Sequence, residues 1–313
     1  MIGIFNNPVV AVEVGGLFGH AAEDIRDRAN TSAQAESQGE RATREDSYTD
    51  EFIFQVRGTI SRRLDEVARR LSNTGERVEI NFYPTNLPVS DETQYGADIG
   101  IRLTLRTPDI TLVKGILVQC KRMYGPPTSP SYPELRGRGE KQAKDMLRIT
   151  PASFYMLFNF GNQADLLNYA SIPAGLVCPM DGGITIPINK STNIGSSCPV
   201  WSNSAGSIWD MGIAMLPATR ILALSASASA RKTNIPVDVT TILRGCLPLG
   251  VFVTDLLGAC FVGDVREEVI RIVTPRVLRD QSFAVTGLTD TSFNGFGVRH
   301  YIDIVISSER RGL

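Results

Sequence analysis

Three polar residues of complementary chemistry flank one predicted β-hairpin: Asp98, Gln119 and Lys121. Carboxylate and carboxamide oxygens are ligands for hard divalent cations such as Mg²⁺, which keep several waters when bound. A bound cation polarises a phosphate group and lowers the pKa of an attacking water. A nearby ammonium stabilises the charge that builds on the phosphoryl oxygens. These residue types therefore suit metal-assisted hydrolysis of a phosphodiester, provided that the fold brings them together.

The predicted hairpin consists of two apolar strands and the turn between them. Residues 99–106 alternate between apolar and polar side chains, which is typical of a half-buried strand. Residues 112–120 form a second apolar run, and the sequence Thr-Pro-Asp-Ile at 107–110 is a turn signal. The pattern therefore predicts an antiparallel pair of strands.

The register of this hairpin decides whether the three residues share a face. If Pro108 and Asp109 are the turn residues, Asp98 lies opposite Gln119. Lys121 is two residues beyond Gln119, so both side chains point to the same face. Because Pro-Asp is not an ideal two-residue hairpin loop, the register could shift, and a shift by one residue would separate the cluster.

The elements around the hairpin alternate between helix and strand. Apolar residues at helical spacing predict a helix over 47–71, and residues 78–83 have the composition of a strand. After the hairpin we expect a basic helix at 138–149 and an aromatic-rich strand at 154–160. The order helix, three strands, helix, strand is typical of an α/β fold, in which a central sheet is flanked by helices.

The N-terminal region, residues 1–46, is interpreted as a strand followed by a polar linker. Residues 9–14 are the strand candidate. Residues 21–46 carry seven acids and four bases without a clean apolar stripe, which indicates a disordered linker or a solvated helix. The alternative is an interaction segment, or a mask over a basic groove.

The C-terminal region, residues 166–313, differs in character from the predicted core at 47–165. Its short apolar runs, such as 184–188 and 301–306, are broken by Gly, Pro, Ser and Thr, and residues 225–230 are a small-residue repeat. We expect mixed α and β structure here. The role of the region as a sensor, an interaction surface or a fold extension stays open.

The composition is that of an ordinary globular protein, 42% hydrophobic and 21% charged. A formal net charge of −1 disfavours non-specific coating of nucleic acid, although a local basic groove is enough to hold phosphates. The five cysteines form no C-x-x-C pair and there are two histidines, so neither a structural zinc site nor cysteine or serine catalysis is favoured. No apolar run suits a bilayer span and the N-terminus lacks a cationic start, so we expect a cytosolic protein.

The sequence Gly-Ala-Asp-Ile-Gly around Asp98, followed by Gln-Cys-Lys at 119–121, resembles the D…(E/Q)-x-K signature of the PD-(D/E)XK (restriction-endonuclease-like) nuclease superfamily. The Q-x-K variant is similar to that of Mrr-like restriction enzymes and of nuclease domains in anti-phage systems. The resemblance covers residues 47–160. It implies a restriction-endonuclease-like core, with a mixed α+β C-terminal region after it.

By this resemblance, Asp98 and Gln119 bind a Mg²⁺ or Mn²⁺ ion together with the backbone carbonyl of Cys120. Lys121 orients or activates water and contacts the scissile phosphate. An acid from the preceding helix often joins such sites. Glu51 is the first choice for that acid, both as a catalytic residue and as a metal ligand. It would compensate for the charge that is missing where Gln119 replaces an acid.

A basic surface for substrate is expected beside this site. Residues 121–148 contain seven Lys or Arg against three acids, a local excess of four. Gln142 resembles a glutamine that is frequent in the family, whereas Met146 stands where RecB-like members carry a tyrosine, which disfavours a RecB-type exonuclease. Asp50 is the second choice for the helical acid. The residues assigned to substrate contact are Arg122, Lys141, Gln142 and Lys144, and the first helix adds Arg57, Arg62, Arg63, Arg69 and Arg70.

The resemblance implies a metal-dependent DNA endonuclease in prokaryotic anti-phage or foreign-DNA defence, which self-associates and works with a defence-system partner protein. Two alternatives stay open. The chain could be a non-catalytic binding or structural subunit of a larger defence or phage assembly. It could also be a serine or cysteine hydrolase, whose activity would survive chelation of metal.

Overall fold

The computed structural model describes most of the chain. The described residues are 8–38, 45–72, 75–84, 95–109, 111–126, 128–170, 208, 210–244, 246–258, 263–275 and 298–308. The apolar run predicted at 184–188 lies outside these residues. None of the described helices is long and apolar enough to cross a membrane.

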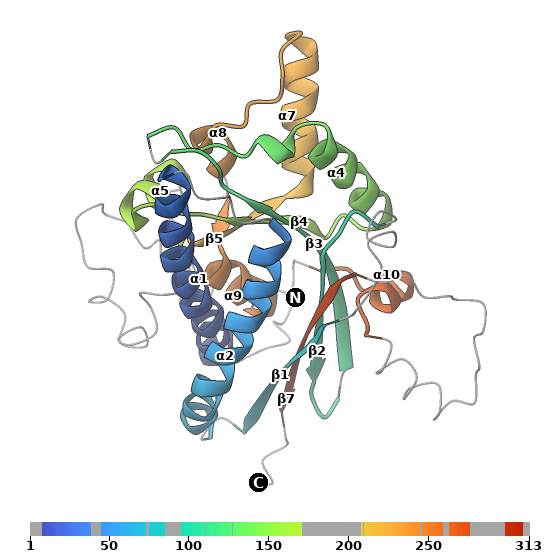
Figure 1. Ribbon diagram of the computed structural model, residues 1–313. Helices are drawn as coiled ribbons and strands as arrows, with labels where there is room; N and C mark the ends of the chain where they lie inside the picture. The colour runs from blue at the N-terminus through green and yellow to red at the C-terminus, as the bar shows by residue number, and fades with distance from the viewer. Residues whose placement is uncertain are drawn as a thin grey trace.

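A seven-stranded mixed sheet forms the centre of the fold, with the strand order β1-β7-β2-β3-β4-β5-β6 (Figure 1). β2 and β3 are antiparallel, whereas β3 with β4 and β2 with β7 are parallel. In this order the last strand of the chain, β7, lies between β1 and β2. The strands are β1 (Glu76–Pro84), β2 (Ile99–Arg106), β3 (Thr111–Arg122), β4 (Ser153–Phe158), β5 (Ile213–Pro217), β6 (Leu247–Pro248) and β7 (His300–Ser308).

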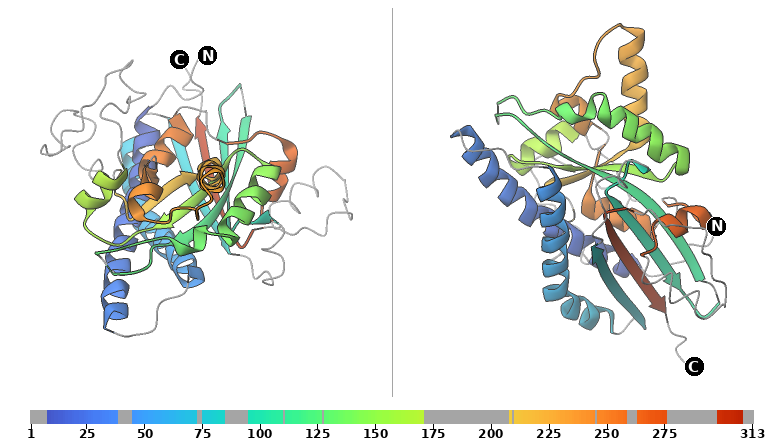
Figure 2. Two further views of the ribbon diagram at one scale, coloured as in Figure 1. Left: turned by 90° about the horizontal axis from the view of Figure 1, so that it is seen from above. Right: turned by 45° about the vertical axis from the view of Figure 1, so that its right-hand side comes forward.

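Helices cover both faces of the sheet (Figures 1 and 2). α1 (Pro8–Ser37), α2 (Glu45–Leu71) and α9 (Leu249–Gly258) pack on one face, which we call the α1 face. α4 (Arg138–Ile149), α7 (Ala218–Ala230) and α10 (Glu267–Ile272) pack on the opposite face, the α4 face. The shorter helices are η1 (Pro133–Leu135), α5 (Gln163–Ala170) and α8 (Val239–Leu243).

Side-chain contacts assign the strand residues to these two faces. Phe158 of β4 packs on Phe52 of α2, with 5.9 Å between the ring centroids. Tyr155, three residues earlier, therefore points to the other side of the strand. Its hydroxyl donates a hydrogen bond to the carbonyl of Gly139 in α4. The α1 and α4 faces are thus separated by the alternation of side chains along each strand.

The α/β class predicted from the sequence is confirmed, and so are the elements of the predicted core. Helix 47–71 is α2, strand 78–83 is β1, and the basic helix at 138–149 is α4. The apolar residues of α2 are buried because their spacing of three and four places them on one side of the helix. These residues include Phe52, Val56, Ile60, Val67 and Leu71.

The predicted strand at residues 9–14 is wrong. This segment is the first part of α1, and the apolar residues recur at helical rather than strand spacing: Val10, Val14, Leu17 and Phe18 are all buried. The helix continues through Ile25, which is fully buried. Residues 21–37 are therefore helical, as one of the two interpretations predicted, and the linker interpretation is wrong for them. The helix is solvated only in part, because Ile25 and Ala29 are buried in the core.

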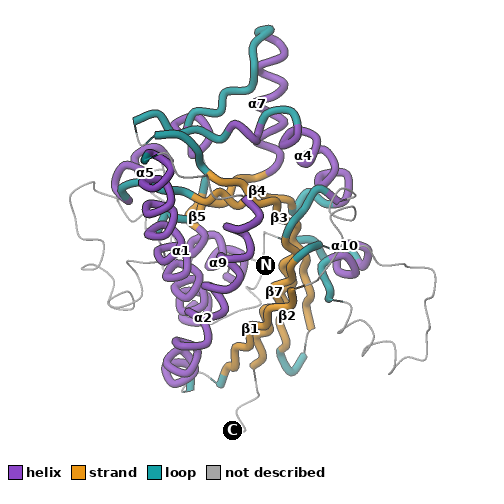
Figure 3. The backbone as a smooth tube through the Cα atoms, in the orientation of Figure 1, coloured by secondary structure: helices purple, strands orange, loops and turns teal. Residues whose placement is uncertain are grey.

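The C-terminal region extends the sheet of the predicted core (Figure 3). β5 pairs with β4, and β7 pairs with both β1 and β2. The small-residue repeat at 225–230 lies within α7, and the run at 301–306 lies within β7. The described part of this region thus adds strands to both sides of the β2–β3–β4 unit.

Candidate functional site

Asp98 is held at the open end of the β2–β3 hairpin by the backbone. Its N–H donates to the carbonyl of Val118 at 2.9 Å, and its carbonyl accepts from the N–H of His300 at 3.0 Å. The predicted register is confirmed, because Ile99 pairs with Val118. Asp98 therefore lies opposite Gln119, as the sequence predicted.

The Asp98 side chain turns toward β3. Its Oδ2 accepts a short hydrogen bond from Nε2 of Gln119 and a second one, of 2.7 Å, from the backbone N–H of Cys120. The same Gln119 Nε2 also donates to the carbonyl oxygen of Cys120 at 3.3 Å. One partly positive nitrogen thus bridges two oxygens, which are both expected metal ligands.

This arrangement fits a divalent cation. Asp98 Oδ2 and the Cys120 carbonyl already converge on a common point, where the Gln119 amide supplies positive charge. A half-turn of that amide would direct its oxygen to the same point, because a carboxamide carries a donor and an acceptor on one carbon. The resulting set of oxygen ligands is the kind that Mg²⁺ and Mn²⁺ prefer.

Lys121 points to the same side of β3 as Gln119, because the two are separated by one residue of a regular strand. Its side chain is only 2% exposed, and Nζ lies 4.0 Å from Oε2 of Glu134 in η1. Removing a charged ammonium from water costs free energy. The structure thus holds this ammonium out of water, close to the Glu134 carboxylate and on the same side of β3 as Gln119.

Glu134 is a carboxylate that the sequence did not single out. It accepts a hydrogen bond of 2.6 Å from the hydroxyl of Tyr124, and its side chain is 38% exposed. Its proximity to Lys121 arises from the loop that follows β3, whose path no periodicity specifies. The one signal in the sequence was its position just before a basic helix.

α4 packs over this end of the hairpin. Gly96 has φ of +67°, and a Cβ atom there would lie 2.9 Å from the carbonyl oxygen of Gln142. The backbone of α4 thus approaches the turn that precedes Asp98. Oε1 of Gln142 is buried and has no hydrogen-bond partner in the described part of the chain. Gln142 therefore lies on the α4 face, near the cluster, with an unused acceptor.

The structure does not bring Glu51 to Asp98. α2 covers the α1 face, whereas the Asp98 side chain points to the α4 face with that of Gln119. The Glu51 carboxylate pairs with Arg28 of α1 at 2.7 Å. Asp50, the second choice, contacts Arg299 at 2.8 Å and His300 at 2.9 Å. The backbone N–H of His300 donates to the carbonyl of Asp98, but the His300 ring is on the α1 face, where it contacts Asp50.

The residues assigned to substrate contact divide between the two faces. Arg122 points to the α1 face, where its buried guanidinium binds both carboxylate oxygens of Glu36 and stacks on the ring of Tyr124. Lys141 and Lys144 are exposed on α4, and Lys144 pairs with Glu140 at 2.7 Å. The α4 residues are thus near the cluster, whereas Arg122 is not placed with it.

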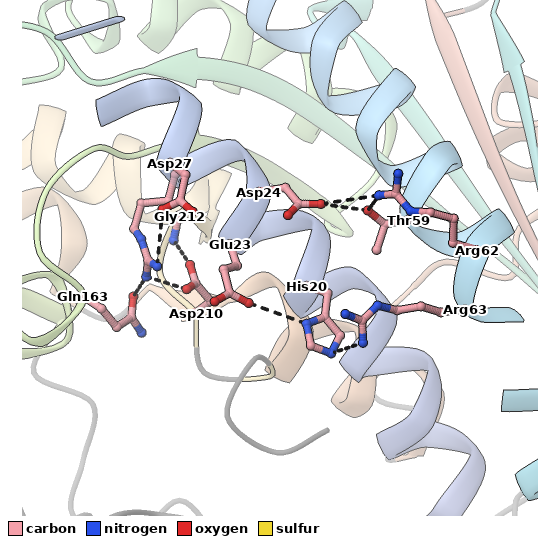
Figure 4. A network of polar contacts seen from close by, with 11 residues as sticks. His20, Glu23, Asp24, Asp27, Thr59, Arg62, Arg63, Gln163, Asp210 and Gly212 are labelled. Atoms are coloured by element: carbon pink, nitrogen blue, oxygen red, sulfur yellow. Dashed lines mark hydrogen bonds and ion pairs between the residues drawn. The ribbon is translucent and has the colours of Figure 1, made fainter. Parts of the chain in front are cut away.

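Arg62 and Arg63 of α2 bind α1 instead of lining a groove beside the cluster (Figure 4), and Arg57 and Arg69 are exposed on the same helix. Arg62 lies 3.9 Å from Asp24, and Arg63 lies 2.8 Å from Nε2 of His20. Burial, and then the charge of Arg63, lower the pKa of His20. These contacts join the two long helices of the α1 face.

A buried ion pair lies in the same network (Figure 4). Arg26 of α1 binds Asp210, the residue three before β5, and also donates to Gln163 at 2.9 Å. Burial raises the pKa of Asp210 to about 6, although Arg26 and the backbone N–H of Gly212 act in the opposite direction. We regard this pair as structural, because it ties α1 to the edge of the sheet.

The comparisons with known proteins add no relative. No family model matches the chain, and no curated protein or solved structure matches it significantly. Within the described ranges, no group of three or more His, Cys, Asp or Glu is arranged to hold a metal ion. A metal centre at the hairpin end would therefore depend on the amide of Gln119 and the carbonyl of Cys120 as well as on Asp98.

Proposed function

We propose that this chain is a metal-dependent phosphodiesterase, with DNA as its substrate, built on a restriction-endonuclease-like core. One observation carries the proposal. The carboxylate of Asp98 and the carbonyl of Cys120 converge on the Gln119 amide, on the same side of β3 as the buried ammonium of Lys121. A site of this composition combines oxygen ligands for a cation with a positive charge for a phosphate.

Each residue would have a separate task. Asp98, Gln119 and the Cys120 carbonyl would hold Mg²⁺ or Mn²⁺. The cation would polarise the phosphodiester and make a bound water more acidic. Lys121 would bind the scissile phosphate and hold the developing charge, and its burial keeps solvent from weakening that interaction. Glu134, 4.0 Å away, would hold the ammonium in position.

The order of elements supports this proposal. The chain runs from α2 through β1, β2 and β3 to α4 and β4, and β4 is parallel to β3. The Gln119 end of β3 lies under α4, and the resemblance implies a helix after the strand that carries the lysine. The insertion of β7 between β1 and β2 is a departure from the simple order of strands. It leaves the β2–β3 hairpin and its polar end intact.

A non-catalytic binding or structural subunit is the second candidate function. One observation favours it. Gln119 stands where an acid would bind a metal ion more strongly, and the described residues contain no group of three His, Cys, Asp or Glu that could replace it. The cytosolic location, the role in prokaryotic defence, self-association and a defence-system partner stay predictions.

Plasmid nicking tests the proposal. We expect wild-type protein to convert supercoiled DNA in the presence of Mg²⁺ or Mn²⁺ and to lose this activity in EDTA. Asp98→Ala and Lys121→Ala should abolish the cutting. Glu51→Gln is the matched control, because its carboxylate pairs with Arg28 on the α1 face. Metal-dependent cutting that persists in Asp98→Ala would contradict the proposal, and cutting that survives EDTA would indicate a serine or cysteine hydrolase.

A further inference from the structure

The outer surface of α4 carries more cations than acids, and its acids are less exposed than its cations. The side chain of Asp145 is only 14% exposed and that of Glu140 is 25% exposed, whereas Lys144 and Arg148 are 58% and 77% exposed. A Cβ at Gly96 would touch Asp145, so this acid faces the turn before Asp98. Glu140 still pairs with Lys144 at 2.7 Å and Asp145 with Arg148 at 3.4 Å, so Arg138 and Lys141 supply the positive excess on this side of the helix.

The exposed cations of α4 follow one stripe. Arg138, Lys141, Lys144 and Arg148 are separated by three or four residues, which places them on one side of a helix. Arg136, just before the helix, is also exposed, and its Nε donates to the carbonyl of Ile235 at 3.1 Å. Ile235 follows α7, so this bond joins the start of the α4 stripe to the chain that returns from α7.

α7 packs against α4 and then projects beyond the rest of the molecule, as two views show (Figures 1 and 2). The tip of this projection is the exposed pair Arg231 and Lys232. Lys232 has φ of +56°, and within the described ranges it is the one non-glycine residue with positive φ. This position follows the helix end, where glycine is usually found because it has no Cβ.

A lysine at a strained glycine position indicates that its charge is useful. Cations near a helix C-terminus are favourable in themselves, but that effect does not need this particular backbone conformation. We propose that the exposed cations of α4 and the α7 tip, named here the α4–α7 ridge, bind the phosphate backbone of a nucleic-acid duplex. The ridge consists of Arg136, Arg138, Lys141, Lys144, Arg148, Arg231 and Lys232.

The surface fits a duplex better than a lipid bilayer. Helices that bind anionic membranes combine cations with large apolar residues that enter the lipid. The large hydrophobic side chains exposed in the described part are Phe54 of α2 and Val265, and neither lies on α4 or α7. A polar and positively charged ridge instead matches the regular negative charge of a phosphate backbone.

The ridge also lies on the side of the sheet where the candidate metal centre lies. α4 packs over Gly96, two residues before Asp98, and the α4 stripe is on its solvent side. The choice of nucleic acid as partner rests on the proposed function. The excess of exposed cations on α4 and the backbone conformation of Lys232 are independent of that function.

Binding of a short fluorescent DNA duplex in EDTA tests the ridge without any contribution from catalysis. We expect Arg138→Gln/Lys141→Gln to weaken binding by about 10-fold or more at about 0.1 M salt, and to flatten the dependence of log K on log salt by about two units. Arg57→Gln/Arg69→Gln, on α2, is the matched control, since it removes the same charge from exposed positions of the opposite layer. It should leave the affinity and the salt dependence unchanged.

Lys232→Gly separates binding from folding. Glycine adopts φ of +56° without strain, so this variant should unfold at the same or a higher temperature than wild type while its duplex affinity falls a few-fold. The same titrations with vesicles containing anionic lipid provide the comparison with a membrane.

Several outcomes would overturn the ridge. They are absence of duplex binding, equal loss in the ridge and α2 variants, or tighter ridge-dependent binding to vesicles than to DNA. Ridge-dependent binding in EDTA, together with absence of metal-dependent cutting, would refute only the phosphodiesterase and leave the ridge supported.

Discussion

Replacement of Asp98 by asparagine separates the structural from the chemical role of its carboxylate. Two hydrogen bonds to this side chain end on one oxygen, Oδ2, which accepts from Gln119 Nε2 and from the N–H of Cys120. The carbonyl oxygen of an asparagine has two lone pairs and can accept both bonds in the same place. The variant therefore keeps the geometry and removes the charge.

The expected loss of stability is small. A hydrogen bond to a charged group contributes about 1.5–3 kcal/mol, and a neutral one about 0.5–1.5 kcal/mol. For two bonds that become neutral, Asp98→Asn should lower the free energy of unfolding by about 2 kcal/mol. Chains somewhat smaller than this one lose about 2–4 °C in melting temperature for each kcal/mol of stability, so the melting temperature should fall by several degrees.

The expected loss of metal binding is large, because the described cluster contains one carboxylate as a ligand. Ligand charge tunes divalent-cation affinity over several orders of magnitude, so we expect Mn²⁺ affinity to fall by about 100-fold or more. At a concentration about 100 times its Kd, Mn²⁺ should stabilise the wild-type fold by about 2.7 kcal/mol and the variant by almost nothing.

Thermal unfolding with and without Mn²⁺ measures both quantities, and calorimetric titration checks the affinity. Asp50→Asn is the matched control, because its carboxylate has ionic partners on the α1 face, Arg299 and His300. It should keep the Mn²⁺-dependent rise in melting temperature. Equal stabilisation of wild type and Asp98→Asn by Mn²⁺ would refute the assignment of Asp98 as a ligand.

Three further predictions concern other carboxylates. Burial raises the pKa of Asp210 to about 6, so between about pH 4 and 6 the folded chain holds a proton that the unfolded chain has lost. The free energy of unfolding should therefore fall by about 3 kcal/mol as the pH rises through this window. Asp210→Asn should remove this pH dependence in denaturant titrations. Hydrogen bonds from Arg266 lower the pKa of Asp264 to about 2. The ionised carboxylate should therefore add about 2 kcal/mol to the free energy of unfolding above about pH 4, and this contribution should be lost as the pH falls toward 2. Asp264→Asn should remove this acid-dependent loss, and an unchanged acid profile would contradict the assignment. Glu134→Gln should lower kcat for cleavage by about 10-fold, with KM and stability little changed (within about 0.5 kcal/mol for stability), because the side chain is 38% exposed. A change in stability alone would indicate a structural role.

The hairpin register was predictable from the sequence because it depends on neighbours along the chain. A strict alternation of apolar residues, with a turn between two strands, leaves few ways to bury one face. That pattern was enough to place Asp98 opposite Gln119, and the structure has them in hydrogen-bond contact. Helices α2 and α4 were predictable for the same local reason, namely one apolar side at helical spacing.

The remaining features depend on contacts between distant segments. The valines at residues 9–14 suggested a strand, whereas the segment belongs to a longer helix, α1, that packs against α2 and α9. The position of β7 between β1 and β2 pairs residues about 200 apart in the chain, such as Arg102 with Asp303, which no local pattern specifies.

The composition of the site was likewise decided in two stages. The spacing of residues 98, 119 and 121 determined an acid, an amide and a lysine on one face, because alternation along a strand has a fixed period. The helices and loops that pack on each face of the sheet decide which further residues join these three. α2 lies on the α1 face and takes Glu51 away from the cluster, whereas the loop after β3 returns Glu134 to within 4.0 Å of the Lys121 ammonium.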